Sequence, residues 1–156
     1  MPPPARRGRR VAPLLALLVL LASCASGEPD LEVGTARAGV PAGGATQITL
    51  EITNHGDGDD QLVGAGTPAA AAVELHETVI DDGQASMVEH EAVPLPAGET
   101  VSFRPGSLHL MMVLPDESVD EGGTFPLTLR FEASDERTVE VEVVPTADLL
   151  DGPVAE

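Results

Sequence analysis

The chain has 156 residues, enough for one domain, and 26 acidic residues against eight basic ones. Four of the eight basic residues precede Cys24 and all acidic residues follow it, so the chain after residue 23 has a formal net charge of −22 and no lysine. Phosphate binding needs a basic face, which excludes nucleic acid as a partner. The absence of tryptophan and tyrosine also argues against an aromatic platform for bases or sugars.

Residues 1–23 have the features of a lipoprotein signal peptide. Four arginines precede an apolar run over residues 11–22, which is too short to span a bilayer and suits a signal-peptide core. The run ends at Leu21-Ala22-Ser23-Cys24, which resembles a bacterial lipobox. We therefore expect an exported protein that is lipid-anchored through Cys24, at the outer face of the cell membrane or in the periplasm. An ordinary signal peptide with a cysteine nearby is the alternative.

Cys24 is the only cysteine in the chain. An internal disulfide, a thiolate metal site within the folded part and a cysteine nucleophile are therefore all excluded.

The predicted elements of the remaining chain are short strands. We expect residues 24–30 to form a lipidated tether, 31–144 to form one domain and 145–156 to form a flexible tail. Strands are predicted, in chain order, over residues 47–53, 62–65, 73–79, 85–93, 100–103, 108–114, 125–133 and 138–144. Asp82-Gly83 is typical of a hairpin turn, whereas Thr67 and the alanine run after it indicate a connector.

About eight short strands with turns every eight to twelve residues are typical of an antiparallel β-sandwich with Greek-key connections. No amphipathic helix is predicted after the signal peptide. The expected fold class is all-β.

Two histidines and two methionines in the middle of the chain form a candidate metal site: His76, Met87, His109 and Met111. Two imidazoles and two thioethers are soft, uncharged ligands, which suit Cu(I) better than Mg²⁺ or Ca²⁺. On a strand His109 and Met111 project from one face while Met112 points into the core. The alternative is that the methionines merely fill the core and the histidines lie separately on the surface.

The spacing His-x10-Met-x21-His-x-Met resembles the signature of the PCuAC-type periplasmic copper chaperones. Further likeness extends over roughly residues 31–144, including Val73-Glu74-Leu75-His76-Glu77-Thr78 and Pro105-Gly106-Ser107-Leu108-His109-Leu110-Met111. The resemblance implies a cupredoxin-like β-sandwich in which His76, Met87, His109 and Met111 bind Cu(I). It also implies delivery of copper to an acceptor such as the copper centre of cytochrome c oxidase, beside a Sco-type thiol protein.

Other functions stay open at this point. The same four residues would serve a copper-sequestering or storage lipoprotein, and a structural β-sandwich would need no metal. The chain lacks a glycine-rich phosphate loop and a zinc-hydrolase His-Glu-x-x-His motif, so catalysis is not expected. His90, three residues from Met87, is not expected in the site because it points to the opposite face of its strand.

Overall fold

The computed structural model describes residues 27–150. The predicted signal peptide, the lipidation site Cys24 and residues 151–156 of the predicted tail lie outside the described residues. No helix in the described part of the chain is long and apolar enough to cross a membrane.

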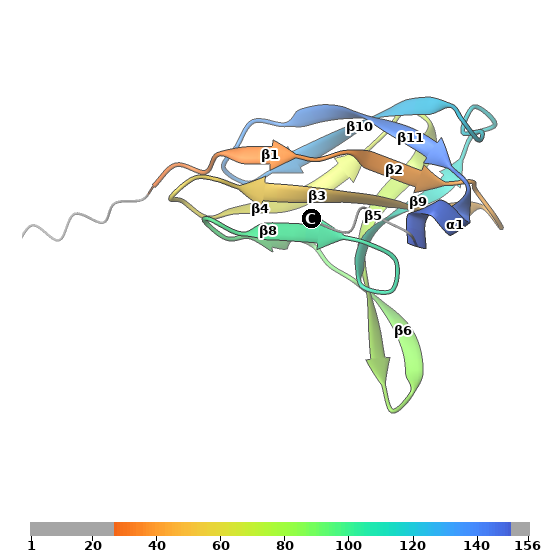
Figure 1. Ribbon diagram of the computed structural model, residues 1–156, viewed down its shortest axis with the longest axis horizontal. Helices are drawn as coiled ribbons and strands as arrows, with labels where there is room; N and C mark the ends of the chain where they lie inside the picture. The colour runs from red at the N-terminus through yellow and green to blue at the C-terminus, as the bar shows by residue number, and fades with distance from the viewer. Residues whose placement is uncertain (1–26, 151–156) are drawn as a thin grey trace, which may run out of the picture.

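Residues 27–150 form eleven strands and one short helix, in the order β1 (Leu31–Val33), β2 (Ala36–Gly39), β3 (Ala45–Asn54), β4 (Asp60–Gly66), β5 (Ala70–Asp81), β6 (Gln84–Glu89), β7 (Val93–Leu95), β8 (Thr100–Phe103), β9 (Leu108–Pro115), β10 (Thr124–Phe131), β11 (Arg137–Val144) and α1 (Thr146–Leu150). The strands are hydrogen-bonded in the order β6-β5-β9-β3-β2-β11-β10-β4-β7, and β4 also pairs with β5. That extra pairing closes the sheet around one core (Figure 1). The predicted all-β Greek-key fold is confirmed; one pairing, β2 with β11, is parallel.

The ten residues of β3 organise the closed sheet. Its residues alternate between partly exposed and buried, and Ile48, Leu50 and Ile52 are in the core, as their alternation predicts. Along one edge of β3, residues 45–48 pair with β9 and residues 50–53 pair with β8. Along its other edge, residues 48–49 pair with β2 and residues 52–54 pair with β1. β3 therefore fixes the register of β9, which carries two of the predicted ligands.

The structure contains three strands that are not predicted separately, β1, β2 and β7, and it also differs from the prediction at the start of β5 and at residues 146–150. The alanine run over 70–72, predicted as a connector, begins β5, because Ala70 and Ala72 pair with β9 despite alanine's low strand propensity. β7 begins at the last residue of the strand predicted over 85–93, and its Pro94 is tolerated because, among the described strands, β7 pairs with β4 alone. Residues 146–150 of the predicted tail form α1, whose Leu149 is buried.

The β5–β6 hairpin projects from the closed sheet (Figure 1). Asp82 and Gly83 both have positive φ angles, 48° and 80°, which is the conformation of a type I′ turn and agrees with the Asp-Gly signal in the sequence. β5 is therefore shared: its first part belongs to the closed sheet and its last part to a projecting two-stranded arm.

Candidate metal centre

His76 and His109 face each other across two neighbouring strands. They are direct partners in the antiparallel register of β5 and β9, next to the pair Leu75 and Leu110. Both leucines are buried in the core, so the two histidines lie on the outer face of the sheet. Their ring centroids are 6.0 Å apart and the rings are nearly perpendicular, at 85°. Two imidazoles bound to one metal at about 2 Å per nitrogen have centroids about 5–6 Å apart, so this spacing is compatible with a shared ion.

The ring of His109 is oriented by the backbone just before it. Its Nδ1 lies 2.8 Å from the carbonyl oxygen of Ser107. A carbonyl oxygen can only accept, so Nδ1 carries the proton and Nε2 has a free lone pair. His109 is fully buried, and its Nε2 has no hydrogen-bond partner among the described residues. A neutral imidazole with one nitrogen held by a carbonyl is a typical arrangement for a metal-binding histidine.

A carboxylate on the same strand lies beside the ring of His76. Its Nε2 lies 3.1 Å from Oε2 of Glu74, two residues earlier and therefore on the same face. Its other ring nitrogen, Nδ1, is buried and has no hydrogen-bond partner in the described part of the chain. A proton on Nε2, the nitrogen that lies beside the carboxylate, would leave the lone pair of His76 on Nδ1.

Two unpartnered, buried imidazole nitrogens on facing strands require an explanation, because a buried polar atom without a partner costs about 1–3 kcal/mol. The described residues offer three such atoms in all, and two of them belong to this pair. A metal ion bound by both nitrogens would satisfy both lone pairs. The donor set therefore fits the group that the sequence predicts.

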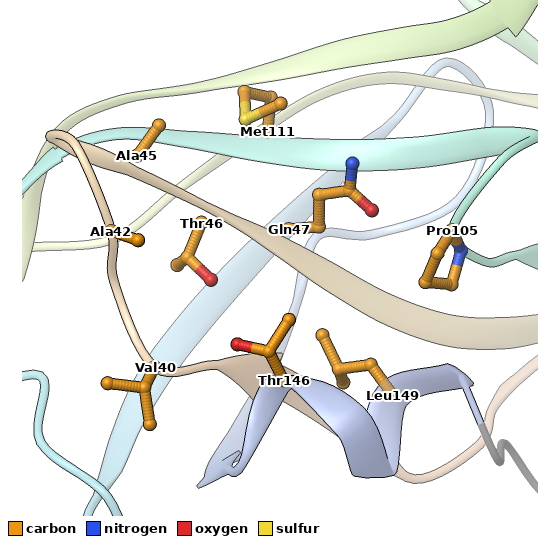
Figure 2. A pocket seen from close by; sticks show the side chains of 9 residues that line it. All are labelled: Val40, Ala42, Ala45, Thr46, Gln47, Pro105, Met111, Thr146 and Leu149. Carbon is orange, nitrogen blue, oxygen red and sulfur yellow. The ribbon is translucent and has the colours of Figure 1, made fainter.

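Met111 follows His109 by two residues and shares its outer face. It is partly buried, and it lines an open pocket of about 430 Å³ that also includes residues of β3 and α1 (Figure 2). The other lining residues are Val40, Ala42, Ala45, Thr46, Gln47, Pro105, Thr146 and Leu149. Met111 is also the register partner of Glu74, so a thioether and a carboxylate stand side by side next to the histidine pair.

Met87 lies on the projecting arm. Its register partner on β5 is Thr78, whereas His76 is paired with Glu89. Met87 is thus a diagonal neighbour of His76 on the same face, and its side chain remains 56% exposed. The structure brings the two histidines together and places the two methionines on either side of them. The assignment of all four as ligands stays a prediction.

Met112 and His90, which are not expected in the site, lie elsewhere. Met112 is fully buried in the core, as predicted. His90 contacts Glu77 at 2.9 Å, and Glu77 points to the opposite face of β5 from His76. The described residues include no group of three or more histidine, cysteine, aspartate or glutamate side chains arranged to hold a metal, so a site made of such ligands alone is absent from that part.

Glu74 and Ser107 are not among the residues that the sequence predicts for the site. A signal for Glu74 existed, because residues two apart on a strand share a face. No comparable signal pointed to Ser107, whose carbonyl reaches His109 only because the backbone folds back between Arg104 and Leu108, where the amide of Arg104 bonds the carbonyl of Leu108 at 2.6 Å.

Comparisons with known proteins agree with this fold. The family model described as "LpqE-like: Putative lipoprotein LpqE-like" matches residues 30–143. A protein named "Putative lipoprotein Lxx21020" from Leifsonia xyli subsp. xyli is 30% identical over 146 residues, covering 86% of this chain and 88% of that protein.

Among solved structures, the copper-bound PCuAC domain from PmoF2 is similar with a TM-score of 0.63 and 22% identity, over 74% of this chain and 92% of that domain. The solution structure of CuI-DR1885 from Deinococcus radiodurans is similar with a TM-score of 0.57 and 24% identity, over 73% and 77%. At these identities the likeness establishes the fold. The resemblance to the PCuAC type and its cupredoxin-like architecture is thereby confirmed; the spacing motif itself is not tested by it.

Proposed function

This chain belongs to the LpqE-like lipoprotein family, and from that premise we propose that it is an exported, lipid-anchored carrier of Cu(I) that hands the ion to an acceptor protein. The observation that carries the proposal is the pair of buried lone pairs on His76 Nδ1 and His109 Nε2. The copper-bound relatives of the same fold add support.

The chemistry of the donor set favours the monovalent ion. Two neutral imidazoles and the thioethers of Met87 and Met111 add no charge to the site and match the softness of Cu(I). The mature chain has no thiolate that would hold copper more tightly, since its one cysteine is the predicted lipidation site. The ion is therefore bound by ligands from which a stronger thiolate site can take it.

The two histidines and Met87 have different roles in the proposed site. His76 and His109 are held by Glu74 and Ser107 and form the rigid side of the site. Met87, exposed on the arm, forms the side from which copper enters and leaves. As acceptors we propose the copper centre of cytochrome c oxidase or a Sco-type thiol protein, following the family resemblance.

The ligand assignment is tested by replacing both methionines with leucine, which keeps volume and apolarity while removing the sulfur. The wild type is expected to bind one equivalent of Cu(I), and the Met87→Leu/Met111→Leu variant to bind at least about 100-fold more weakly in competition with a Cu(I) chelator. Met112→Leu is the matched control: it removes a thioether from the same strand but from the buried face, and should leave the affinity unchanged.

Unchanged affinity in the double variant would refute the two methionines as ligands. Binding that is weak and without stoichiometry in the wild type would favour a structural β-sandwich. Tight binding without transfer to the apo copper domain of cytochrome c oxidase would favour sequestration, the second function compatible with the same site.

The lipid anchor is tested separately. Cys24→Ser removes the proposed acylated thiol, so the variant should lose incorporation of labelled fatty acid and move from the membrane to the soluble fraction. A membrane-bound Cys24→Ser variant would contradict the lipoprotein assignment and leave the copper site untouched.

A further inference from the structure

The β5–β6 arm has few contacts with the rest of the molecule. The register between β5 and β9 ends at Glu77 and Leu108, and beyond it β5 pairs with β6 alone. One backbone bond, from the amide of Thr78 to the carbonyl of Ser107 at 3.0 Å, ties the base of the arm to the loop before β9. A two-stranded hairpin without further packing is marginally stable in water, so an arm of this length calls for a role outside the monomer's own core.

Exposed apolar side chains are concentrated on this arm. Six large hydrophobic residues are exposed among those described, and four of them lie here: Val79, Ile80, Met87 and Val88. Ile80 is 70% exposed, the largest fraction of the six. A local concentration of exposed apolar surface is typical of a protein interaction site.

The arm has two faces, and one is continuous with the histidine pair. Ile80 alternates with Thr78 and His76 along β5, and the register places Met87 beside Thr78 and Ala85 beside Ile80. Ile80 and Met87 thus extend the outer face that carries His76. Val79 and Val88 lie on the opposite face.

The negative charge of the arm determines which kind of partner can bind the face that carries Ile80 and Met87. Residues 70–91 contain six carboxylates and neither arginine nor lysine: Glu74, Glu77, Asp81, Asp82, Glu89 and Glu91. A second copy of this strongly acidic chain would be repelled, as would the anionic surface of a membrane. A partner with basic residues around an apolar patch would be attracted and steered to the arm.

We propose that the face of the β5–β6 arm formed by Ile80, Ala85 and Met87 is the docking surface for the copper acceptor, which presents an apolar patch ringed by lysine or arginine. The inference rests on the proposed copper-carrier function and adds where the acceptor binds. Docking there brings the acceptor's ligands next to Met87, the exposed member of the predicted ligand set. Covering Ile80 removes from water the most exposed large apolar side chain of the described residues.

The test compares the two faces of the same arm. Ile80→Thr and Val88→Thr each replace an exposed β-branched residue by another, so both keep strand propensity and neither removes a predicted ligand. The measurement is the second-order rate of Cu(I) transfer from each loaded variant to the apo copper domain of cytochrome c oxidase, with Cu(I) affinity determined alongside. Transfer should slow about 10-fold in Ile80→Thr and less than about 2-fold in Val88→Thr, with unchanged affinity in both.

A second pair of variants tests the charge argument. Asp81→Asn/Asp82→Asn removes two carboxylates from the arm, and Glu117→Gln/Glu121→Gln removes two exposed ones from the loop between β9 and β10. The arm variant should transfer copper more slowly at low salt and show a weaker dependence on ionic strength than the loop variant.

The outcomes separate the two proposals. Wild-type transfer with equal rates in Ile80→Thr and Val88→Thr overturns the docking surface and leaves the copper-carrier function standing. A wild type that binds Cu(I) tightly and transfers none overturns delivery and the docking surface together.

Discussion

At the scale of single residues, the geometry of the candidate centre depends on groups that do not themselves reach the ion. The carbonyl oxygen of Ser107 accepts a hydrogen bond from Nδ1 of His109, and the carboxylate of Glu74 lies 3.1 Å from Nε2 of His76. The bond to Ser107 decides which ring nitrogen of His109 offers its lone pair, and we expect the charge of Glu74 to favour a proton on Nε2 of His76. The histidines are therefore set for binding before any ion arrives.

Glu74 is expected to be a positioning residue for His76. Glu74→Ala should lower the Cu(I) affinity about 10–100-fold and mix the two neutral tautomers of the His76 ring, which ¹⁵N NMR of the apo protein reports. Glu74→Gln keeps an oxygen that accepts from Nε2 and should restore most of the affinity. Glu77→Ala, on the opposite face of β5, is the control. An unchanged tautomer in Glu74→Ala would contradict the role.

Asp60 is a buried carboxylate that ties two segments together away from the centre. Its oxygens accept hydrogen bonds from the amides of Gln61, Ala133 and Ser134 at 2.7, 2.8 and 3.0 Å. Burial by itself would raise the pKa of Asp60, but the hydroxyl of Ser134 and these three amides outweigh it, so the pKa lies below its ordinary value of 3.8. The charged form thus stabilises the fold.

Asp60→Asn is expected to lower the free energy of unfolding at pH 7 by about 1.5–3 kcal/mol, because charge-assisted hydrogen bonds are lost. A folded pKa below the unfolded one contributes stability that is present above about pH 4 and is lost as the pH falls through the folded value. The difference between wild type and variant, measured by urea unfolding, should therefore be large at pH 7 and shrink towards pH 2. A difference that grows in acid would contradict the assignment.

At the scale of elements, β5 is the strand that links the two parts of the candidate centre. Its first half pairs with β9 and places His76 opposite His109, and its second half pairs with β6 and places Met87 beside them. The type I′ turn sets the register of the arm, since a shift by one residue would turn Met87 to the opposite face. The turn at Asp82 and Gly83 therefore determines the face on which Met87 lies, although neither residue belongs to the candidate centre.

Gly83→Ala tests this coupling. The φ of Gly83 is 80° and no atom lies within 4 Å of an added Cβ, so the cost is conformational, about 1 kcal/mol. Amides of β6 should exchange about 5-fold faster, while those of β3 and β9 remain as protected as in the wild type. Gly34→Ala is the control, because that glycine has no positive φ and its nearest neighbour would lie at 3.5 Å. Equal exchange changes in both variants would contradict the local effect.

The elements also mark where local sequence signals are sufficient. The alternation in β3, β10 and β11 and the Asp-Gly turn all predict what the structure contains. β7 and the start of β5 could not be predicted in this way, because a proline and an alanine run become strand only through pairing with β4 and β9. α1 likewise depends on Leu149 finding a buried place beneath the start of β3 and beside β2.

At the scale of the whole molecule, negative charge dominates. After residue 23 four arginines face 26 carboxylates. Such an excess keeps the protein soluble and draws cations and basic partners towards it, and it also strains the compact state through self-repulsion. The closed sheet tolerates the repulsion because its core is continuous from β1 to β11.

Salt is therefore expected to stabilise the fold. Raising the ionic strength from about 10 to 150 mM shortens the screening length from about 30 to 8 Å and should raise the free energy of unfolding by about 0.5–1 kcal/mol. Urea unfolding of the domain in potassium chloride, repeated in tetramethylammonium chloride, measures the effect and separates screening from ion binding. Stability that falls with both salts would show that attractive ion pairs prevail over repulsion.

The sequence by itself determined the class of the fold, the strand that carries each candidate ligand and the face on which His109 and Met111 project, because period-two alternation and turn chemistry act over a few residues. It also determined the soft character of the donor set, which follows from residue types alone. Only the tertiary structure decided that His76 stands opposite His109, that Glu74 and Ser107 leave one nitrogen of each ring without a partner, and that Met87 stays exposed on an arm. These features depend on register between strands far apart in the chain, and that register is set by core packing around β3 rather than by any local signal.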